Sequence, residues 1–448
     1  MPSVRIAVIG GGSPYMTSMF ASLARFARQG SLKDSTIVLH DRVPENARLM
    51  GAWGEAAARR EGLPLRFVTA DSLPSALDGA DFVLSTFRTG GLDSRYQDET
   101  IPLRHGELGV ETVGLGGIFM ALRCIPDVVT LTQAVRKHCP DAWIINYTNP
   151  TNMVTDATLR CGHTRTLGLC DGVYGVKWLI CKLLGLPCGK AGEIEAYVAG
   201  INHCTWTMKL FYHGRDLYRE LPDILKTADL QPAGYQSEVG NKLDQVQVEA
   251  IRLYRYYGIL PGSVYYTRYY YALREVMAHH LAPGFQQRSE WLRDLAARKR
   301  GMIARQLKEG CASLAAYDDE DSSHGDQAVG ALNAVANDTR KLEVANVVNN
   351  GAVPNLPNDA VVEVACILGR HGALPVAAGP LPFAVQDIVR AAHACAKLTV
   401  DGALSGDRNL VLQAALVHPV HRDLDTAEKV IDALFVAHRQ WLPQFFST

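Results

Sequence analysis

The sequence lacks the features that mark nucleic-acid-binding or membrane proteins. Its 448 residues carry a formal net charge of −1, so no broad basic field is present to attract nucleic acid or anionic lipid. The apolar run from Ile6 to Ile9 is too short for the core of a signal peptide, and no run is of membrane-spanning length. We therefore expect a cytoplasmic protein that binds small molecules, and neither nucleic acid nor membranes.

Regular cysteine spacing, internal repeats, low-complexity tracts and linkers rich in Pro, Gly or Ser are also missing. Ten cysteines scattered along so long a chain are not typical of a secreted disulfide framework, and reducing cytosol would keep them as thiols. With 48% hydrophobic residues, the chain can bury a sizeable core. Because no linker separates them, we expect two large lobes that pack closely on each other.

The first part of the chain alternates strand-like and helix-like patterns. This alternation predicts an α/β fold with an N-terminal Rossmann-like, doubly wound parallel sheet. Beyond Lys190 two further strands and then mainly helices are expected, so we predict a nucleotide-binding domain at 1–190 and a mixed, helix-rich C-terminal domain at 191–448. The expected strands are 4–9, 36–39, 82–86, 143–146, 195–198 and 207–212, and the expected helices include 47–61 and 125–138.

A glycine-rich loop follows the first predicted strand. Gly10, Gly11 and Gly12 would let the backbone approach a pyrophosphate closely, and a helix that begins near Ser13 would favour its negative charge. The usual fingerprint has a third spaced glycine where Tyr15 stands here. The loop therefore predicts a dinucleotide site, although a glycine turn between a strand and a helix can also be purely structural.

Asp41 ends the second predicted strand, about 30 residues beyond the loop, where the usual pattern has about 20. A carboxylate at this position can accept hydrogen bonds from an adenosine ribose and would repel a 2′-phosphate. It favours NAD over NADP. Alternatively, Asp41 only caps the helix expected to start near Pro44.

Polar and sulfur-containing side chains follow two later strands. Cys170 comes after an apolar run and should lie at the carboxyl edge of the sheet, where the polar segment Asn146 to Pro150 also ends a strand. A thiolate from Cys170 and an imidazole from His203 could bind a divalent metal and leave positions open for substrate oxygens. The alternatives are a packed cysteine, a core histidine, and Asp171 as a helix cap or a general acid.

With these motifs together, the chain resembles glycoside hydrolase family four, the NAD- and metal-dependent glycosidases that include 6-phospho-β-glucosidases and α-galactosidases. The resemblance runs almost from end to end. It is carried by Gly10-Gly11-Gly12-Ser13, Glu111-Thr112, Gly116-Gly117, Ala121-Leu122-Arg123, Asn146 to Pro150, Cys170, Gly200-Ile201-Asn202-His203, Asn349-Asn350-Gly351, Asn355-Leu356-Pro357 and His418-Pro419.

The resemblance implies that Cys170 and His203 bind a divalent metal, most often Mn, whose shell the substrate's 2- and 3-hydroxyls complete. It implies cleavage by elimination and addition: NAD takes hydride from C3, a base removes the C2 proton, the aglycone leaves, water adds and hydride returns. Tyr266 matches the base, with Arg268 as the nearby charge, although five tyrosines between Tyr265 and Tyr271 leave its register open to a slip or to simple core packing. Asp171 matches the acid of some members.

The remaining site residues are also implied by the resemblance. The cofactor-binding residues are Gly10, Gly12, Ser13, Asp41 and Asn149, and the substrate-binding residues are Arg95, Glu111, Asn149 and Asn202. Members of the family form dimers and tetramers, so we expect a homodimer or a homotetramer. The tyrosine-rich segment resembles the β-glucoside branch, which favours β-linked glycosides as substrates.

The chain departs from the phospho-glycosidase branch in one loop. That branch has an arginine and paired glycines where this chain reads Asp321-Ser322-Ser323-His324-Gly325-Asp326, and an acidic loop is a poor cradle for a phosphate dianion. We therefore expect β-glycosides to be cleaved without a 6-phosphate. A strict 6-phospho-β-glucosidase stays open, because Arg88, Arg95 and Arg274 could bind an anion, and a 2-hydroxyacid dehydrogenase or a non-enzymatic NAD-binding regulator are further alternatives.

Overall fold

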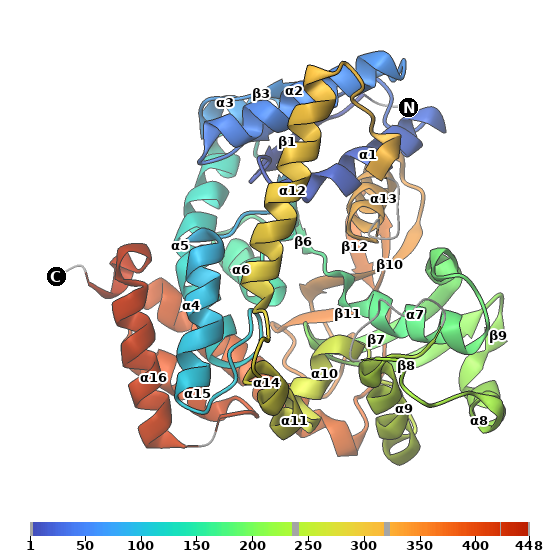
Figure 1. Cartoon of the computed structure of the whole chain (residues 1–448), viewed down its shortest axis with the longest axis vertical. Helices are drawn as coiled ribbons and strands as arrows, with labels where there is room; N and C mark the ends of the chain where they lie inside the picture. Colours follow the sequence, from blue (N-terminus) through green and yellow to red (C-terminus); the bar gives the residue numbers. More distant parts are fainter. Residues whose placement is uncertain (1–2, 235–241, 318–322, 422, 447–448) are drawn as a thin grey trace.

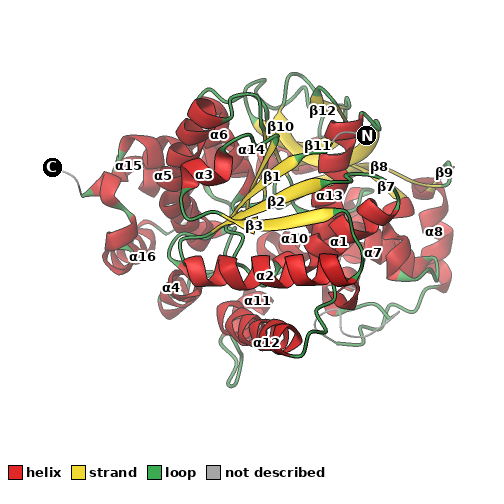
Figure 2. Cartoon of the chain, turned by 90° about the horizontal axis from the view of Figure 1, so that it is seen from above, coloured by secondary structure: helices red, strands yellow, loops and turns green. Residues whose placement is uncertain are grey.

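The computed structural model describes residues 3–234, 242–317, 323–421 and 423–446. One mixed sheet of twelve strands runs through this part of the chain (Figures 1 and 2). Across the sheet the strands are, in order, β3 (Leu65–Thr69), β2 (Ser35–His40), β1 (Arg5–Ile9), β4 (Phe82–Ser85), β5 (Trp143–Asn146), β6 (Thr166–Gly168), β10 (Lys341–Val348), β11 (Val361–Gly369), β7 (Ile194–Ile201), β8 (Cys204–Tyr212) and β9 (Arg215–Asp216), with β12 (Gly372–Pro375) paired to β11.

Helices cover both faces of this sheet, as Figure 2 shows for the N-terminal half. They are α1 (Met16–Arg28), α2 (Pro44–Arg60), α3 (Leu73–Leu77), α4 (Gly91–Arg104), α5 (Gly114–His138), α6 (Thr151–Arg160), α7 (Tyr174–Leu183), α8 (Leu217–Thr227), α9 (Gln245–Tyr257), α10 (Val264–Tyr271), α11 (Leu273–His280), α12 (Arg288–Lys308), α13 (Ser323–Asn337), α14 (Phe383–Ser405), α15 (Arg408–Val417) and α16 (Leu424–Ala437).

The six strands from β3 to β6 are parallel in the order 3-2-1-4-5-6, which is the doubly wound order of a Rossmann-like sheet. On β1, Ile6 and Val8 pack into the core with α1 and α2, whereas Ala7 and Ile9 pack into the core with α3 and α5. Because β1 is buried on both faces, it reads as a continuous apolar run in the sequence. The predicted fold class is confirmed, although β3 was missed.

The sheet continues past residue 190 instead of ending there. Asn346 of β10 pairs with Gly168 of β6, and Glu363 of β11 pairs with Gly200 of β7, so antiparallel strands join the two predicted domains edge to edge. The sequence predicted mainly helices after the strands expected at 195–198 and 207–212. This prediction is wrong for β10, β11 and β12. Their apolar, β-branched composition is a strand signal, so the pattern was readable there.

Helix α5 begins at Gly114, eleven residues before the predicted start, and most of its residues are buried. It is long and apolar enough to cross a bilayer by length and composition, contrary to our expectation, but 78% of its apolar window is buried inside the protein. Helices α6, α14 and α15 pack on it. Burial of this kind is what the central helix of a protein core requires.

The ten cysteines all lie in the described part of the chain, and each is a free thiol. This agrees with the expectation that they form no disulfide framework. The dense charge run at residues 318–323, which its sequence indicates to be an exposed loop, lies almost wholly outside the described residues.

Candidate active site

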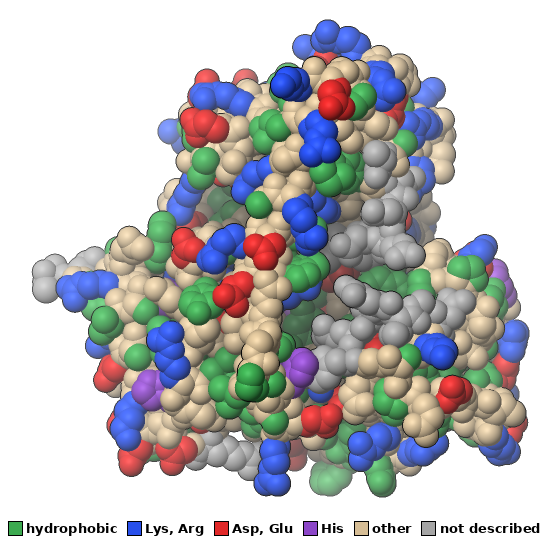
Figure 3. Space-filling view, viewed as in Figure 1, with side chains coloured by type: hydrophobic (Ala, Val, Ile, Leu, Met, Phe, Trp, Pro, Cys, Tyr) green, Lys and Arg blue, Asp and Glu red, His purple; other side chains and the backbone are tan. Residues whose placement is uncertain are grey.

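A cavity of about 1420 Å³ lies at the carboxyl edge of the parallel strands. The glycine loop after β1 forms one end, and Cys170, which directly follows β6, lies at the other. Helix α12 crosses one side, with Trp291 and Lys299 in the cavity wall. Figure 3 shows the hollow beside α12 and the Lys and Arg side chains along this helix. The position agrees with the rule that open α/β sheets bind ligands beyond their carboxyl ends.

The glycine loop is packed so tightly that side chains would not fit. Gly10 has φ +92°, and a Cβ there would lie 2.4 Å from the carbonyl oxygen of Thr86. A Cβ on Gly12 would lie 2.6 Å from Cβ of Asn46. The backbone amides of Gly10 and Gly11 both donate to the carbonyl of His40 at the end of β2. The turn therefore exposes bare backbone to the cavity, as close contact with a pyrophosphate requires.

Asp41 lies against this loop and lines the cavity. Its Oδ2 accepts a hydrogen bond from the Gly12 amide at 3.0 Å, and its Oδ1 accepts one from Val43 at 2.9 Å. The N-cap position of α2 is Val43, so Asp41 is not the N-cap of that helix. Ser13 and Asn149 also line the cavity.

Cys170 and His203 come from the two predicted domains, and Cys170, which lines the cavity, is in contact with His203. The Sγ of Cys170 lies 3.2 Å from Nε2 of His203, and both residues are buried. His203 adopts a left-handed backbone with φ +66° in the tight turn between β7 and β8, which directs its ring toward β6. The pairing of β6 with β10, β10 with β11 and β11 with β7 places this turn beside Cys170.

The two side chains have the character of a metal site. Burial raises the pKa of the Cys170 thiol, and the charges of Glu363 and Asp171 raise it further, which opposes the thiolate form that binds metals. Burial lowers the pKa of His203 to about 3, so its imidazole is neutral and has a lone pair to give. Sulfur and imidazole nitrogen suit borderline divalent cations. Among the described residues no group of three or more His, Cys, Asp or Glu could hold a metal, so Cys170 and His203 stand as a pair.

Tyr266 lies directly on the His203 ring. The two ring centroids are 3.4 Å apart and the planes are inclined by 7°. Burial raises the pKa of the Tyr266 phenol well above its ordinary value, and the negative charges of Cys170 and Asp171 add to this. The other tyrosines differ: Tyr265 bonds to Asp244, and Tyr271 packs on Trp206.

The sequence suggested Arg268 as the positive charge that acts on Tyr266, but the structure indicates a different arginine. Arg268, on the same helix, faces Glu249 of α9 at 3.5 Å. Arg95 of α4 instead interacts electrostatically with Tyr266. The helical step from Tyr266 to Arg268 carries the two side chains to different faces of α10, which explains why closeness in sequence misled.

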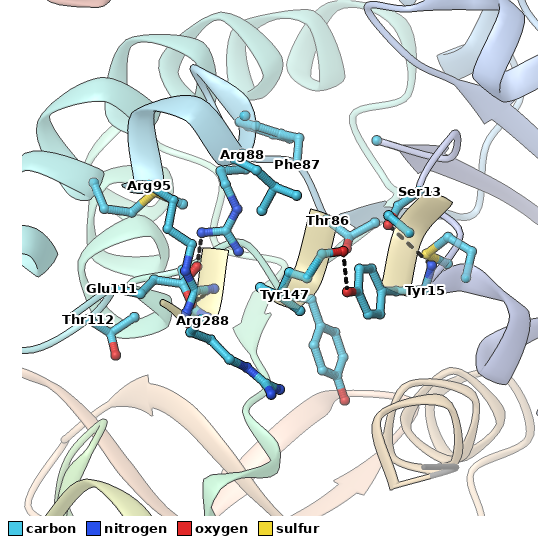
Figure 4. A pocket seen from close by; sticks show the side chains of 18 of the residues that line it. Ser13, Tyr15, Thr86, Phe87, Arg88, Arg95, Glu111, Thr112, Tyr147 and Arg288 are labelled. Carbon is cyan, nitrogen blue, oxygen red and sulfur yellow. Dashed lines mark hydrogen bonds and ion pairs between the residues drawn. The ribbon is translucent and has the colours of Figure 1, made fainter. Parts of the chain in front are cut away.

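Glu111 joins two arginines in the cavity wall. Arg88 and Arg95 both form ion pairs with it, the latter at 2.7 Å, and Figure 4 shows the two guanidinium groups converging on this carboxylate. Arg95 also donates to Glu99 at 2.6 Å. Burial by itself raises the pKa of Glu111, but the charges of Arg88 and Arg95 outweigh it and lower the pKa to about 2. Glu111 is therefore ionised across the physiological range.

Asn202 lies behind the cavity wall beside a buried carboxyl that the sequence did not reveal. Its Nδ2 donates to Oε1 of Glu363 at 2.8 Å, and Asn346 donates to the same oxygen at 3.1 Å. Burial raises the pKa of Glu363 to about 7. Only the pairing of β11 with β7 brings Glu363 here, so no local pattern could have predicted it.

The charged residues that could repel or bind an anionic substrate in the cavity also differ from those predicted from the sequence. Asp326, part of the predicted acidic loop, does not line the cavity and pairs with Arg25 and Ser22 of α1. Asp321 and Ser322 lie outside the described residues. Arg274 is exposed and does not line the cavity. Arg288, which the sequence reading missed, does line it and stacks on Trp291 at 3.9 Å (Figure 4).

Comparison with known proteins gives two family matches that together span most of the chain. The model for the family 4 glycosyl hydrolases matches residues 5–186, and the model for the family 4 glycosyl hydrolase C-terminal domain matches residues 198–421. The stretch between the two matches includes the predicted boundary at residue 190.

Among characterised relatives, a 6-phospho-β-glucosidase of Escherichia coli is 30% identical over 99% of this chain and 97% of its own length. A probable 6-phospho-β-glucosidase of Bacillus subtilis is 28% identical over 99% and 98%. An α-galactosidase of Bacillus subtilis is 30% identical over 84% of each chain.

Solved structures show the same overall shape. A 6-phospho-α-glucosidase from gut microorganisms, crystallised with NAD and Mn²⁺, superposes with a TM-score of 0.88 and 25% identity, over 99% of this chain and 100% of that one. Malate dehydrogenase of Plasmodium falciparum superposes with a TM-score of 0.54 and 14% identity over 91% and 99%, a likeness of fold alone.

Proposed function

The chain belongs to family 4 of the glycosyl hydrolases, and from that premise we propose that it cleaves β-linked glycosides with two cofactors, NAD and a divalent cation, with Mn²⁺ as the first candidate because a similar structure was solved with it. The observation that carries the proposal is the contact of Cys170, His203 and Tyr266 at the far end of a cavity that begins at the glycine loop. A neutral imidazole, a thiol and a phenol in one buried cluster suit cation-assisted proton transfer.

The residues present fit both cofactors. Gly10, Gly12, Ser13, Asp41 and Asn149 line the part of the cavity that would hold NAD, and Cys170 with His203 would hold the cation. When bound, the dinucleotide supplies reversible hydride transfer at the sugar C3, and the cation supplies the Lewis acidity that makes the C2 proton removable.

Side chains of the protein would carry out the proton transfers. Tyr266, as phenolate, takes the proton from C2, and Asp171, which lines the same cavity, gives a proton to the departing glycosidic oxygen. Burial opposes the phenolate, so positive charge must compensate, and Arg95 is positioned to contribute it.

A neutral β-glycoside is our first candidate substrate. The two cavity arginines proposed as anion ligands, Arg88 and Arg95, are already engaged by Glu111 and Glu99, so their charges are balanced before any substrate binds. The acidic-loop argument for the same conclusion is weaker than the sequence suggested, because Asp326 turns to Arg25. That a 6-phosphate is dispensable therefore stays a prediction.

A glycoside with an anionic sugar is the second candidate, and Arg288 is the observation that favours it. Arg288, the first residue of α12, lines the cavity, and its guanidinium could pair with a phosphate or carboxylate. The names of the two 6-phospho-β-glucosidase relatives point the same way.

A panel of nitrophenyl α- and β-glycosides, each with and without a 6-phosphate, tests the proposal, with NAD, MnCl₂ and reductant added or withheld. We expect release of nitrophenol only with both cofactors and faster from the β-anomers. A kcat/KM more than about a hundredfold higher for the 6-phosphate would select the second candidate, since about 2.7 kcal/mol is what a charged hydrogen-bonded pair supplies. Net production of NADH would instead indicate a dehydrogenase.

Assembly and location complete the proposal. We expect a homodimer or a homotetramer in the cytoplasm, and light scattering of the purified chain tests the first.

A further inference from the structure

The second ring nitrogen of His203 has a partner of its own. Nε2 faces the Cys170 sulfur, while Nδ1 lies 2.6 Å from Oγ1 of Thr112, in the loop that leads into α5. Thr112 also lines the cavity, and Figure 4 shows it close to Glu111. The imidazole is thus held from two sides, by a sulfur and by a hydroxyl.

The Thr112 loop has little room to move. Gly117 lies against the Thr112 backbone, where a Cβ would be 2.6 Å from its carbonyl carbon, and a Cβ on Gly116 would be 2.1 Å from the carbonyl oxygen of Val110. The start of α5 is in turn held by His421, whose Nε2 accepts a hydrogen bond from the Leu115 amide at 3.0 Å. The hydroxyl is therefore placed by backbone packing.

A neutral imidazole carries one proton, on one nitrogen or the other. If Nε2 is to donate its lone pair to a cation beside Cys170, the proton must be on Nδ1, and a buried N–H needs an acceptor. The Thr112 oxygen can accept that hydrogen bond. Metal-binding histidines in general depend on such an outer partner to set the proton position and the ring orientation.

From this geometry we infer that Thr112 is a positioning residue for the metal site: its hydroxyl holds His203 with the proton on Nδ1 and with Nε2 turned to the cation position beside Cys170. The inference rests on the proposed function, because it assumes that a cation binds there. It extends that proposal to Thr112, which follows Glu111 in the loop before α5 and lies on a different element from Cys170 and from His203.

Manganese binding to the full chain tests the inference without using activity. Titration of NAD-loaded protein with MnCl₂, followed by electron paramagnetic resonance of free Mn²⁺, should show Thr112→Val binding roughly 10–100-fold more weakly than wild type, and Thr112→Ser within about threefold of it. Valine keeps the shape of threonine without the hydroxyl, whereas serine keeps the hydroxyl. Thr132→Val, a buried change on α5 at a residue that does not line the cavity, should bind as wild type does.

Two results would overturn the inference: unchanged affinity in folded Thr112→Val, or an equal loss in Thr112→Ser. A measurement on the wild type needs no variant at 112. In Zn²⁺-loaded protein with ¹⁵N-labelled histidine, the signal lost in His203→Gln should report a protonated Nδ1, and an unprotonated Nδ1 would refute the assignment. Cys170→Ser distinguishes failure of this inference from failure of the proposed metal site. Undiminished Mn²⁺ binding in Cys170→Ser would show that Cys170 and His203 do not form a metal site.

Discussion

Replacing Glu111 by glutamine should cost the protein a large and pH-dependent part of its stability. The carboxylate is buried between Arg88 and Arg95, and its pKa falls from an ordinary 4.5 to about 2. Since one pH unit corresponds to about 1.4 kcal/mol, ionised Glu111 contributes about 3.4 kcal/mol to the free energy of unfolding. Removal of one partner from a buried ion pair costs about 3–5 kcal/mol in general, which agrees.

The sign of the pH dependence follows from the lowered pKa. Because the folded state holds Glu111 ionised, its contribution is fully present above about pH 4.5 and is lost as the pH falls through about 2. Urea unfolding should therefore find Glu111→Gln less stable than wild type by about 3.4 kcal/mol at pH 7, and by only about 1.4 kcal/mol at pH 3.

The control is Glu220→Gln, which removes an exposed partner of Arg215 and should leave the urea midpoint nearly unchanged. A difference below about 1 kcal/mol between Glu111→Gln and wild type at pH 7 would refute the reasoning, since that is what a solvent-screened pair contributes. So would a difference that stays constant down to pH 3.

Three further substitutions test the site. Cys170→Ser should weaken Mn²⁺ binding by at least the roughly 100-fold that outer partners contribute, and wild-type affinity in this variant would contradict the metal site. Tyr266→Phe should lower kcat by at least about 100-fold and stop the exchange of a C2 deuterium with solvent. The control Tyr271→Phe, beside Trp206, should keep the wild-type kcat and the exchange. Exchange at the normal rate in Tyr266→Phe would exclude Tyr266 as the base. Asp41→Ala should reduce the preference for NAD over NADP in calorimetric titrations, and an unchanged ratio would show that this carboxylate does not face the ribose.

Much of the N-terminal half could be predicted from sequence because its signals are local. Each of the strands β1, β2, β4 and β5 is a short apolar run bounded by polar or turn residues, and such a run is buried in a parallel sheet whatever its neighbours are. The glycine loop is a local signal too, since three successive glycines directly follow a strand.

Other features required the tertiary structure. The sequence named Arg268 as the charge beside Tyr266, but Arg268 turns to Glu249 and Arg95 of a distant helix is the cation whose charge acts on Tyr266. The sequence read Asp326 as part of an acidic loop, but that residue pairs with Arg25. These partners are chosen by helix orientation and by packing between segments far apart in the chain, which no local pattern encodes.

By itself, then, the sequence determined the Rossmann-like half, the family, and a cysteine and a histidine worth pairing. Tertiary structure alone decided that Cys170 and His203 meet, because the antiparallel strands β10 and β11 carry the turn after β7 to the end of β6. It also decided the partners of that pair, Thr112 and Tyr266. Contacts between separate elements depend on strand register and on the packing of whole helices, and these are properties of the folded chain.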